Sequence, residues 1–351
     1  MQALQKLIQW SLDNYSDLPW RTNRTLYTTL VSEIMLQQTT VSTVLKHYQR
    51  FLKEYPELES LTKASEEQLT ISWKGLGYYR RARNLKKAAT GIFEDYQGEF
   101  PLNEKALMDI PGIGRYTANA LIAIGADKRG MALDGNLERV LSRLLLVETE
   151  AGPKLQRELF QKFEKKQIKI FEKEISYREL NEALMDLGRV YCRPKNPQCL
   201  LCPLKSVCSA NKEGRQTEIP VKTQKTKKFY QLELARIVCV RDGKVLVSKR
   251  RKGSWLEGQY EVPSFILNSE DEKLSQYSWW EGEKFDFDQE FKSTITQYKI
   301  TNYVQEVENV PKSIDTESCE WLPIDLAESN LSTATFKCLK KLELQDLNPR
   351  Y

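Results

Sequence analysis

Through the first 190 residues, apolar and polar positions alternate with the 3.6-residue period of an amphipathic α-helix. Three examples are "EQLTISWKGLG", "ARNLKKAATGIFEDY" and "NEKALMDIPGIG", separated by short turns rich in Gly, Pro and Asn. In "LDGNLERVLSRL", residues 133–144, apolar residues recur at i, i+3, i+4 and i+7 from Leu137 onward. Asp134 stands just ahead of this helix and is a residue type that caps helix N-termini. The pattern predicts an all-α region.

The period changes after a polar, lysine-rich segment at 214–229, which we interpret as an interdomain linker. "QLELARIVCVRDGKVLVSKR" alternates apolar and polar residues on both sides of Asp242-Gly243, a typical hairpin turn. "TITQYKITNYVQEV" alternates in the same way, and "LSTATFKCLKKLEL" returns to a helical period. The sequence therefore predicts a multi-domain protein, with an all-α region at 1–213 followed by an α/β domain at 230–351.

Composition narrows the possible functions. The chain has 351 residues and a formal net charge of +5, which is compatible with binding nucleic acid but does not require it. Its one histidine, His47, nearly excludes Ser–His–Asp triads and multi-histidine metal sites. No apolar run approaches the roughly 18–20 residues of a membrane span. The N-terminal helix lacks a signal peptide's uninterrupted apolar core, and we expect a cytoplasmic protein without membrane contact.

Four of the seven cysteines crowd into one segment, with the spacing Cys192-x6-Cys199-x2-Cys202-x5-Cys208. Four thiolates so close in sequence can surround a tetrahedral zinc ion or an iron–sulfur cluster. Structural zinc more often uses two C-x2-C knuckles, and only one is present here, so the spacing favours a [4Fe–4S] cluster. Four unliganded thiols are the remaining alternative. We interpret the centre as a structural element that holds a basic loop.

Residues 110–120, "IPGIGRYTANA", are typical of two helices joined by a tight turn that contains Gly112 and Gly114. Glycines at this spacing permit close approach of backbone N–H groups to an anion. Taken alone, an ordinary αα-hairpin explains the motif equally well. Arg115 at the start of the second helix favours a site that binds a DNA phosphate without reading sequence.

The hairpin, the Asp134 segment that follows it and the four-cysteine loop, in this order, resemble the helix–hairpin–helix DNA glycosylase superfamily. Three further stretches narrow the resemblance to the MutY family of adenine DNA glycosylases: "LPWR" at 18–21, "SEIMLQQT" at 32–39 and "WKGLGYYRRARNL" at 73–85. The match spans nearly all of the first 210 residues. It implies a six-helix domain at about 22–130 and an iron–sulfur domain built from about 1–21 and 131–213.

Hydrolysis of an N-glycosidic bond needs a general acid for the leaving base and a carboxylate that stabilises the cationic sugar. The base must first be flipped out of the duplex. Glu33 lies in the apolar sequence "LVSEIMLQQT", so desolvation should raise its pKa toward that of a usable acid. A solvated surface glutamate is the alternative. By the resemblance, Glu33 protonates adenine N7, Asp134 stabilises the sugar cation, directly or through a covalent intermediate, and Asn136 orients that site.

Tyr116 departs from the pattern of endonuclease III-type glycosylases, which carry a lysine nucleophile at this point of the hairpin. Tyrosine cannot form the Schiff base through which such a lysine cleaves the strand. We therefore expect a monofunctional glycosylase that leaves an abasic site. One alternative is a bifunctional endonuclease III-like lyase for oxidised pyrimidines, which Tyr116 opposes. Another is a non-catalytic iron–sulfur DNA-binding protein. The presence of both Glu33 and Asp134 argues against it.

The resemblance also implies residues that open the duplex and hold the base. Gln38 and Tyr78 resemble wedge residues inserted beside the base opposite the adenine, although Tyr78 taken alone would be a core aromatic. The neighbouring arginines are expected to contact phosphates; they are Arg80, Arg81 and Arg83. Three residues are expected to line the adenine pocket: Trp20, Arg21 and Glu182.

The C-terminal domain resembles the family's Nudix-like recognition domain, through "GSWLEGQYEVPSF" at 253–265 and the closing helix. It lacks the clustered glutamates that a hydrolytic Nudix helix uses for Mg²⁺, so nucleotide hydrolysis is not expected. The resemblance implies a reader of 8-oxoguanine that uses a Phe-Ser-His type loop, where this chain has Thr296 and Gln297. We expect a monomer that excises adenine opposite 8-oxoguanine or G in duplex DNA, with a weaker or differently built lesion search.

Overall fold

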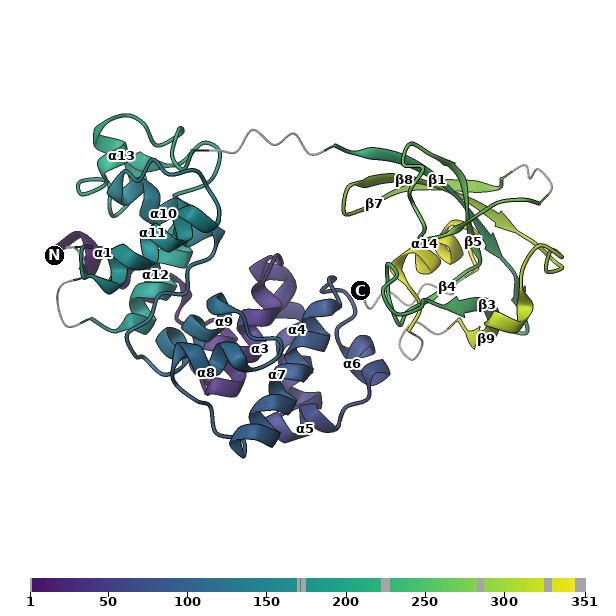
Figure 1. Cartoon of the computed structure of the whole chain (residues 1–351), viewed down its shortest axis with the longest axis horizontal. Helices are drawn as coiled ribbons and strands as arrows, with labels where there is room; N and C mark the ends of the chain where they lie inside the picture. Colours follow the sequence, from purple (N-terminus) through teal and green to yellow (C-terminus); the bar gives the residue numbers. More distant parts are fainter. Residues whose placement is uncertain are drawn as a thin grey trace. The chain divides into compact units, whose positions relative to one another are not determined.

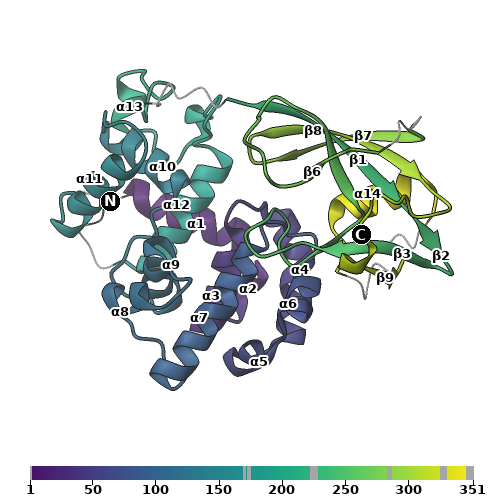
Figure 2. The same ribbon diagram turned by 45° about the vertical axis from the view of Figure 1, so that its right-hand side comes forward.

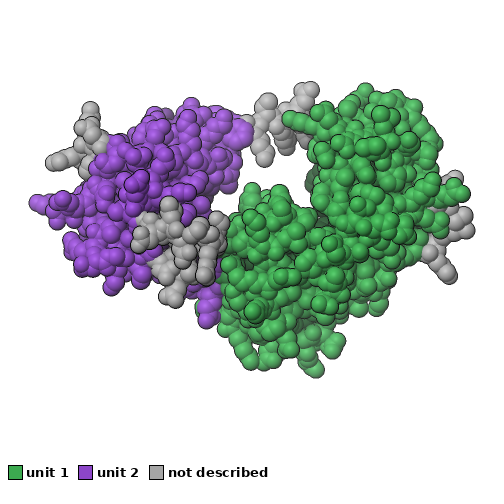
Figure 3. All heavy atoms as spheres, turned by 180° about the vertical axis from the view of Figure 1, so that it is seen from behind, with its two compact units in different colours: residues 1–65, 72–224 green, residues 66–71, 225–351 purple. Residues whose placement is uncertain are grey.

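The structure is a computed structural model of the chain (Figure 1), and it describes residues 2–168, 171, 175–221, 228–282, 287–324 and 330–344. The chain forms two compact units, one of residues 1–65 and 72–224 and the other of residues 66–71 and 225–351 (Figure 3). The first unit is helical and the second contains two β-sheets, which confirms the predicted fold class. Within the described ranges, no helix is long and apolar enough to cross a bilayer.

Helices joined by short turns make up the first unit (Figure 2). Its first half contains α1 (Gln2–Tyr15), α2 (Pro19–Thr22), α3 (Leu26–Leu36), α4 (Val41–Glu54), α5 (Leu58–Lys63), α7 (Arg80–Tyr96), α8 (Glu104–Asp109), α9 (Arg115–Ala120) and the π-helical turn η1 (Leu121–Gly125). Its second half contains α10 (Gly135–Leu145), α11 (Pro153–Glu164), α12 (Tyr177–Val190), the 3-10 turn η3 (Cys199–Leu201) and α13 (Ser209–Lys212). Helix α6 (Glu66–Ser72) lies between α5 and α7 in the sequence.

Polar side chains mark the starts of the helices that carry the predicted site. Thr25 caps α3 and forms a capping box with Thr28, and Asn103 caps α8. Asp134 caps α10, as the sequence predicts, and Ser176 caps α12. Each side-chain oxygen accepts a hydrogen bond from a backbone N–H that the first helical turn leaves unpaired.

One apolar core joins the N-terminal helix to the second half of this unit. Leu4 and Leu7 of α1 are buried in the same cluster as Leu137 and Leu141 of α10 and Leu184 of α12. The four positions that the helical period singled out after Asp134 are all buried in this core. Packing therefore places α1 in one core with helices that begin 120 or more residues after α1 ends.

The first part of the predicted linker is not extended chain between units. Ile219 is buried, and its carbonyl accepts a hydrogen bond from Arg143 Nε at 2.8 Å. The carbonyl of Val221 accepts a hydrogen bond from the Ala151 N–H at 2.9 Å. Residues 214–221 are thus attached to the helical unit by a buried apolar side chain, by backbone hydrogen bonds and by the ion pair of Arg215 with Glu148. Residues 222–227 lie outside the described residues.

The second unit contains two sheets with α14 (Thr333–Lys341) packed against strands of both (Figure 1). The five-stranded sheet has the order β6-β5-β1-β8-β7, in which β1 pairs parallel with β8 and antiparallel with β5. In the other sheet β3 pairs antiparallel with β2, β4 and β9. The strands are β1 (Tyr230–Val238), β2 (Val240–Arg241), β3 (Lys244–Lys249), β4 (Tyr260–Glu261), β5 (Ser264–Ser269), β6 (Ser278–Trp279), β7 (Gln289–Ile295), β8 (Tyr298–Glu306) and β9 (Cys319–Pro323), with a 3-10 turn η4 (Thr316–Ser318) before β9.

The hairpin predicted from Asp242-Gly243 is present between β2 and β3. Both residues have positive φ, 49° and 69°, which is the backbone of the two-residue turn that this dipeptide favours. The unit also buries one ion pair, in which Arg236 Nη1 donates to Glu261 Oε1 at 2.9 Å. Asn302 Oδ1 accepts from Arg236 Nε at 3.0 Å, so most of this charge is satisfied within the core.

The turn between α8 and α9 places one glycine against another helix. Gly112 has a φ of +94°, and a Cβ added there would lie 2.3 Å from the backbone oxygen of Asn84 in α7. Gly114 is the N-cap of α9, and a Cβ there would meet nothing within 4 Å. Gly112 is therefore needed for the close packing of its backbone against that of Asn84, apart from the phosphate-binding role predicted for this turn.

We expect Gly112→Ala to lower the free energy of unfolding by about 2 kcal/mol or more, because the new Cβ must displace backbone and strain φ. The matched control is Gly114→Ala, which should cost about 1 kcal/mol or less, because alanine is a poorer N-cap than glycine but its Cβ enters open space. Denaturant unfolding of the two variants checks this. Equal stability of the two variants would contradict the packing argument.

Candidate active site and DNA interface

Glu33 lies on α3 and is only 4% exposed. Its apolar neighbours in the sequence are buried with it, which explains the desolvation. Burial raises the pKa of Glu33 from 4.5 to about 7, against a lowering by the hydrogen bond from Tyr116. The charges of Glu182 and Asp134 raise the pKa further, and Arg24 lowers it. The carboxyl is thus poised to exchange a proton near neutral pH.

Tyr116, at the start of α9, points its hydroxyl at Glu33. Its Oη donates to Glu33 Oε2 at 2.5 Å, joining residues that are 83 positions apart. Burial raises the pKa of Tyr116 well above its ordinary value, and the carboxylates of Glu33 and Asp134 add to this. The phenol therefore remains a hydrogen-bond donor throughout the range in which Glu33 titrates.

Asp134 is the N-cap of α10, and its charge also acts on Glu33. Its Oδ1 accepts from the backbone N–H groups of Asn136 at 3.0 Å and Leu137 at 2.8 Å, and its Oδ2 accepts from Asn136 Nδ2 at 2.9 Å. Asn136 Oδ1 in turn accepts from Arg139 Nη2 at 3.0 Å. Three N–H donors at a helix N-terminus suit an ionised carboxylate and fix its orientation.

Two of the three residues expected around the adenine, Arg21 and Glu182, form an ion-paired cluster, and the charge of Glu182 acts on Glu33. Arg21 forms ion pairs with Glu182 at 3.3 Å and Asp186 at 3.0 Å. Arg24, which sequence analysis missed, forms the shorter pair with Glu182, at 2.6 Å. Trp20 is buried elsewhere in this region and packs edge-to-face on Tyr48 rather than joining the ion pairs. Nothing in the sequence separates Arg24 from an ordinary surface arginine.

Gln38 and Tyr78 are exposed, and each lies in a left-handed backbone conformation with φ of 55° and 49°. Tyr78 is 64% exposed and not a core aromatic. Arg81 does not match the phosphate contact expected from the sequence, because it is buried and donates to the backbone carbonyls of Gln37 and Gly77, next to Gln38 and Tyr78. Arg80 is exposed and Arg83 is half-buried.

Arg115, at the start of α9 in the hairpin, is exposed but already ion-paired. Its Nε donates to Glu104 Oε1 at 2.8 Å, and Asn119 Nδ2 donates to the other oxygen of Glu104 at 2.9 Å. Its guanidinium also lies 5.1 Å from the ring centre of Phe160. A phosphate at this turn would therefore compete with Glu104 for the arginine, while Gly114 leaves the approach open.

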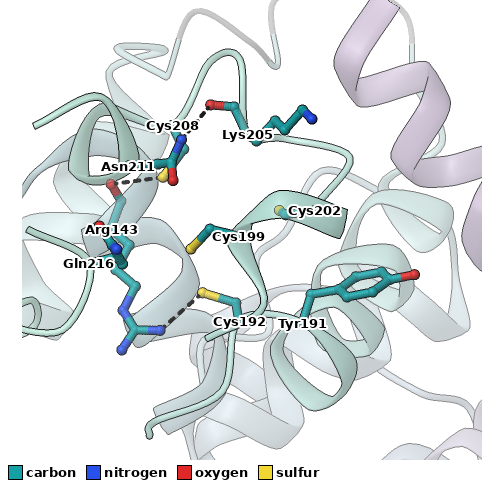
Figure 4. Close-up of a pocket in the computed structure, with 9 residues that line it drawn as sticks. All are labelled: Arg143, Tyr191, Cys192, Cys199, Cys202, Lys205, Cys208, Asn211 and Gln216. Carbon is teal, nitrogen blue, oxygen red and sulfur yellow. Dashed lines mark hydrogen bonds between the residues drawn. The ribbon is translucent and has the colours of Figure 1, made fainter. Parts of the chain in front are cut away.

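The four clustered cysteines line one pocket, shown in Figure 4. All four are free, half-buried thiols. Arg143 donates from Nη1 to Cys192 Sγ at 3.4 Å, and its carbonyl accepts from Cys208 Sγ at 3.5 Å. In the described part of the chain, no three His, Cys, Asp or Glu side chains are grouped so as to hold a single metal ion. Arg139 Nε donates to the Cys192 carbonyl at 2.7 Å and so connects this loop to Asn136.

Thr296 and Gln297 form the exposed turn between β7 and β8. Thr296 has a φ of 53°, and the carbonyl of Gln297 accepts from the Tyr230 N–H at 2.9 Å. Both residues belong to the second unit, whereas Glu33 and Asp134 belong to the first.

The chain matches the HhH-GPD superfamily of base excision DNA repair proteins over residues 31–166. The adenine DNA glycosylase of Buchnera aphidicola subsp. Schizaphis graminum is 31% identical over 300 residues, which are 84% of this chain and 82% of the relative. The adenine DNA glycosylase of Arabidopsis thaliana is 33% identical, over 75% of this chain and 47% of the relative. The solved structure of a thermostable thymine-DNA glycosylase is 28% identical, with a TM-score of 0.51, and covers 60% of this chain and 95% of its own.

The matched superfamily region contains Glu33, Tyr116 and Asp134. The likeness to the Buchnera enzyme is longer than the helical unit, so it extends into the second unit as well. The resemblance predicted from the sequence motifs is confirmed. The chain belongs to the adenine DNA glycosylases of the HhH-GPD superfamily, enzymes of base excision repair that hydrolyse N-glycosyl bonds in DNA.

Proposed function

We propose that this enzyme removes adenine mispaired with 8-oxoguanine or G from duplex DNA, with Glu33 as general acid and Asp134 as the carboxylate that stabilises the sugar. The observation that carries the proposal is the burial of Glu33, which raises its pKa to about 7 and leaves Tyr116 as its hydrogen-bond donor. An acid that is half protonated near neutral pH is suited to donate a proton to a leaving base.

In the proposed reaction, Glu33 gives its proton to N7 of the flipped adenine. The electron pair of the N-glycosidic bond then leaves with the base, and positive charge develops on the sugar. Tyr116 holds the carboxylate that results, through the 2.5 Å hydrogen bond. Glu182, which forms ion pairs with Arg21 and Arg24, would accept a hydrogen bond from the base.

Asp134 would stabilise the sugar cation, directly or through a covalent intermediate, and assist the water that replaces the base. Asn136 holds one oxygen of Asp134 and Arg139 holds Asn136, so the carboxylate is oriented before substrate binds. Because Tyr116 occupies the position of a Schiff-base lysine, we propose a monofunctional enzyme. An endonuclease III-like lyase is correspondingly disfavoured.

Access to the glycosidic bond requires opening of the duplex. Gln38 and Tyr78 are proposed to enter beside the base opposite the adenine, which their exposure permits. The hairpin turn at Gly112–Gly114 would bind a backbone phosphate together with Arg115. Trp20 is proposed as part of the wall of the adenine pocket, since it is buried close to Arg21 in α2.

The cysteine pocket is proposed to hold one [4Fe–4S] cluster through Cys192, Cys199, Cys202 and Cys208. The donor set fits this group, because four thiols and no imidazole or carboxylate line the pocket. The cluster would supply a rigid, four-point anchor for the loop, and Arg143 and Arg139 connect that anchor to α10. Lys205 borders the same pocket and suits contact with a phosphate.

The second unit is proposed to read 8-oxoguanine through Thr296 and Gln297. The hydroxyl and the carboxamide both offer a donor and an acceptor, but neither is an imidazole. We therefore propose adenine excision with a modest preference for 8-oxoguanine over G, by a monomer acting on chromosomal DNA in the cytoplasm of a bacterium.

Single-turnover base release from duplexes with A opposite 8-oxoguanine, G or T tests the function. We expect release opposite 8-oxoguanine and G, none opposite T, and strand breaks only after alkali. Glu33→Gln and Asp134→Asn should each slow release by about 100-fold or more. Glu59→Gln, at an exposed ion pair with Lys63 on α5, is the matched control. Wild-type rates in either active-site variant, or strand breaks without alkali, would contradict the mechanism.

The rate of adenine release should fall as the pH rises through about 7, because Glu33 then loses the proton that it must donate.

The folded state holds this proton more tightly than the unfolded chain does. Glu33 therefore lowers the free energy of unfolding as the pH rises from 4.5 toward 7. Glu33→Gln removes that loss and should be more stable than wild type by ~3 kcal/mol at pH 8 but not at pH 4. Denaturant unfolding at both pH values checks this; a difference independent of pH would refute the assignment.

Iron and acid-labile sulfide analysis of the anaerobically purified protein tests the cluster. We expect about four of each per chain. Cys202→Ser should lower both contents and the thermal stability, because one anchor of the loop is lost. Cys239→Ser, at a buried free thiol of the second unit, should leave the iron and sulfide contents unchanged. One zinc ion per chain and no sulfide would show that the cluster assignment is wrong.

A further inference from the structure

The two proposed wedge residues lie on separate loops. Gln38 belongs to residues 37–39, which follow α3, and Tyr78 belongs to residues 76–79, which precede α7; we call these loop A and loop B. Both residues have positive φ, at 55° and 49°. A left-handed backbone is unfavourable for residues with a side chain and persists only where the surroundings impose it. Something must therefore hold the two loops in this form.

Arg81, in the first turn of α7, contacts both loops with one guanidinium group. It is only 8% exposed. Nη1 donates to the carbonyls of Ile34 at 3.0 Å, Met35 at 2.8 Å and Gln37 at 2.6 Å. Nη2 donates to Thr39 Oγ1 at 2.9 Å and to the carbonyls of Leu76 at 2.8 Å and Gly77 at 3.0 Å. One nitrogen thus serves the end of α3 and loop A, and the other bridges loop A to loop B.

Aromatic rings hold the guanidinium in place. Its central carbon lies 5.6 Å from the ring centre of Trp73 and 5.7 Å from that of Tyr78. Trp73 is fully buried, and its Nε1 donates to the Gly77 carbonyl at 3.2 Å. The planar guanidinium can bridge several acceptors in fixed directions, which a lysine ammonium cannot reproduce.

The same contacts reach the catalytic helix. The carbonyls of Ile34 and Met35 lie in the last turn of α3, where no intrahelical N–H is available to them. Glu33 directly precedes Ile34 on that helix. Helices α3 and α7 also pack on each other (Figure 2). Arg81 therefore joins the end of the helix that carries the general acid to both loops that meet the duplex.

We propose that Arg81 is a positioning residue that locks loops A and B together, so that Gln38 and Tyr78 enter the duplex as one rigid element in register with Glu33. The proposal rests on the DNA-opening role proposed above for those two residues. Arg81 itself does not contact DNA in this arrangement, because its guanidinium is committed to the protein.

Arg81→Lys keeps the charge and removes the bridge. In the full-length enzyme we expect faster hydrogen exchange in peptides covering residues 34–39 and 73–79, and single-turnover adenine release slowed on the order of 10- to 100-fold. Thr39→Val removes one acceptor and should slow release by a few-fold, which keeps the test open if Arg81→Lys folds poorly. Arg157→Lys, the same replacement at an exposed site on α11, should change neither readout.

A double-mutant cycle separates positioning from a general loss of stability. In a Gln38→Ala/Tyr78→Ala background, Arg81→Lys should slow release by less than about threefold, because the residues through which it acts are gone. Equal slowing in both backgrounds, or unchanged hydrogen exchange in the two peptides, would overturn the proposal. If Gln38→Ala/Tyr78→Ala alone excises adenine at the wild-type rate, the wedge assignment fails instead, and hydrogen exchange still decides whether Arg81 joins the loops.

Discussion

The burial of the Glu33 carboxyl on α3 is the constraint around which the helical unit is organised. A carboxylate in an apolar setting must be paired, hydrogen-bonded or protonated, because desolvation disfavours its charge. Here the hydrogen bond comes from Tyr116 of α9, while Arg24 gives its short ion pair to Glu182. Glu33 is thus left able to take up and release a proton. The same hydrogen bond ties α3 to the helical hairpin that precedes the Asp134 segment.

Buried arginines hold the segments of the proposed active site in place by donating to backbone carbonyls. Arg81 serves the end of α3 and two loops, and Arg139 donates to the Gly188 and Cys192 carbonyls as well as to Asn136. Carbonyls at helix ends and in irregular loops have no partners of their own, and a guanidinium satisfies several at once. Irregular backbone around the site can therefore be rigid without being part of regular secondary structure.

Much of this arrangement could be predicted from sequence. The helical period, the Asp134 cap and the Asp242-Gly243 turn are local patterns, and the structure contains all three. The apolar sequence around Glu33 was sufficient to predict its burial. The inward direction of Arg81 could not be predicted, because its acceptors are backbone atoms up to 47 residues away and carry no sequence signature. The packing of residues 214–221 could not be predicted for the same reason, because backbone hydrogen bonds hold the segment in addition to the buried Ile219.

The capping role of Asp134 and the catalytic role proposed for it support each other. Glycosidic hydrolysis needs one carboxyl that donates a proton and another that remains an anion, so the two need contrasting environments. Glu33 is surrounded by apolar side chains and receives a hydrogen bond from a neutral phenol. Asp134 receives N–H donors from the start of α10, where the helix dipole favours negative charge. The N-cap geometry at the start of α10 therefore also orients the Asp134 carboxylate for the role proposed for it. A substitution that weakens the cap would leave this carboxylate less well oriented.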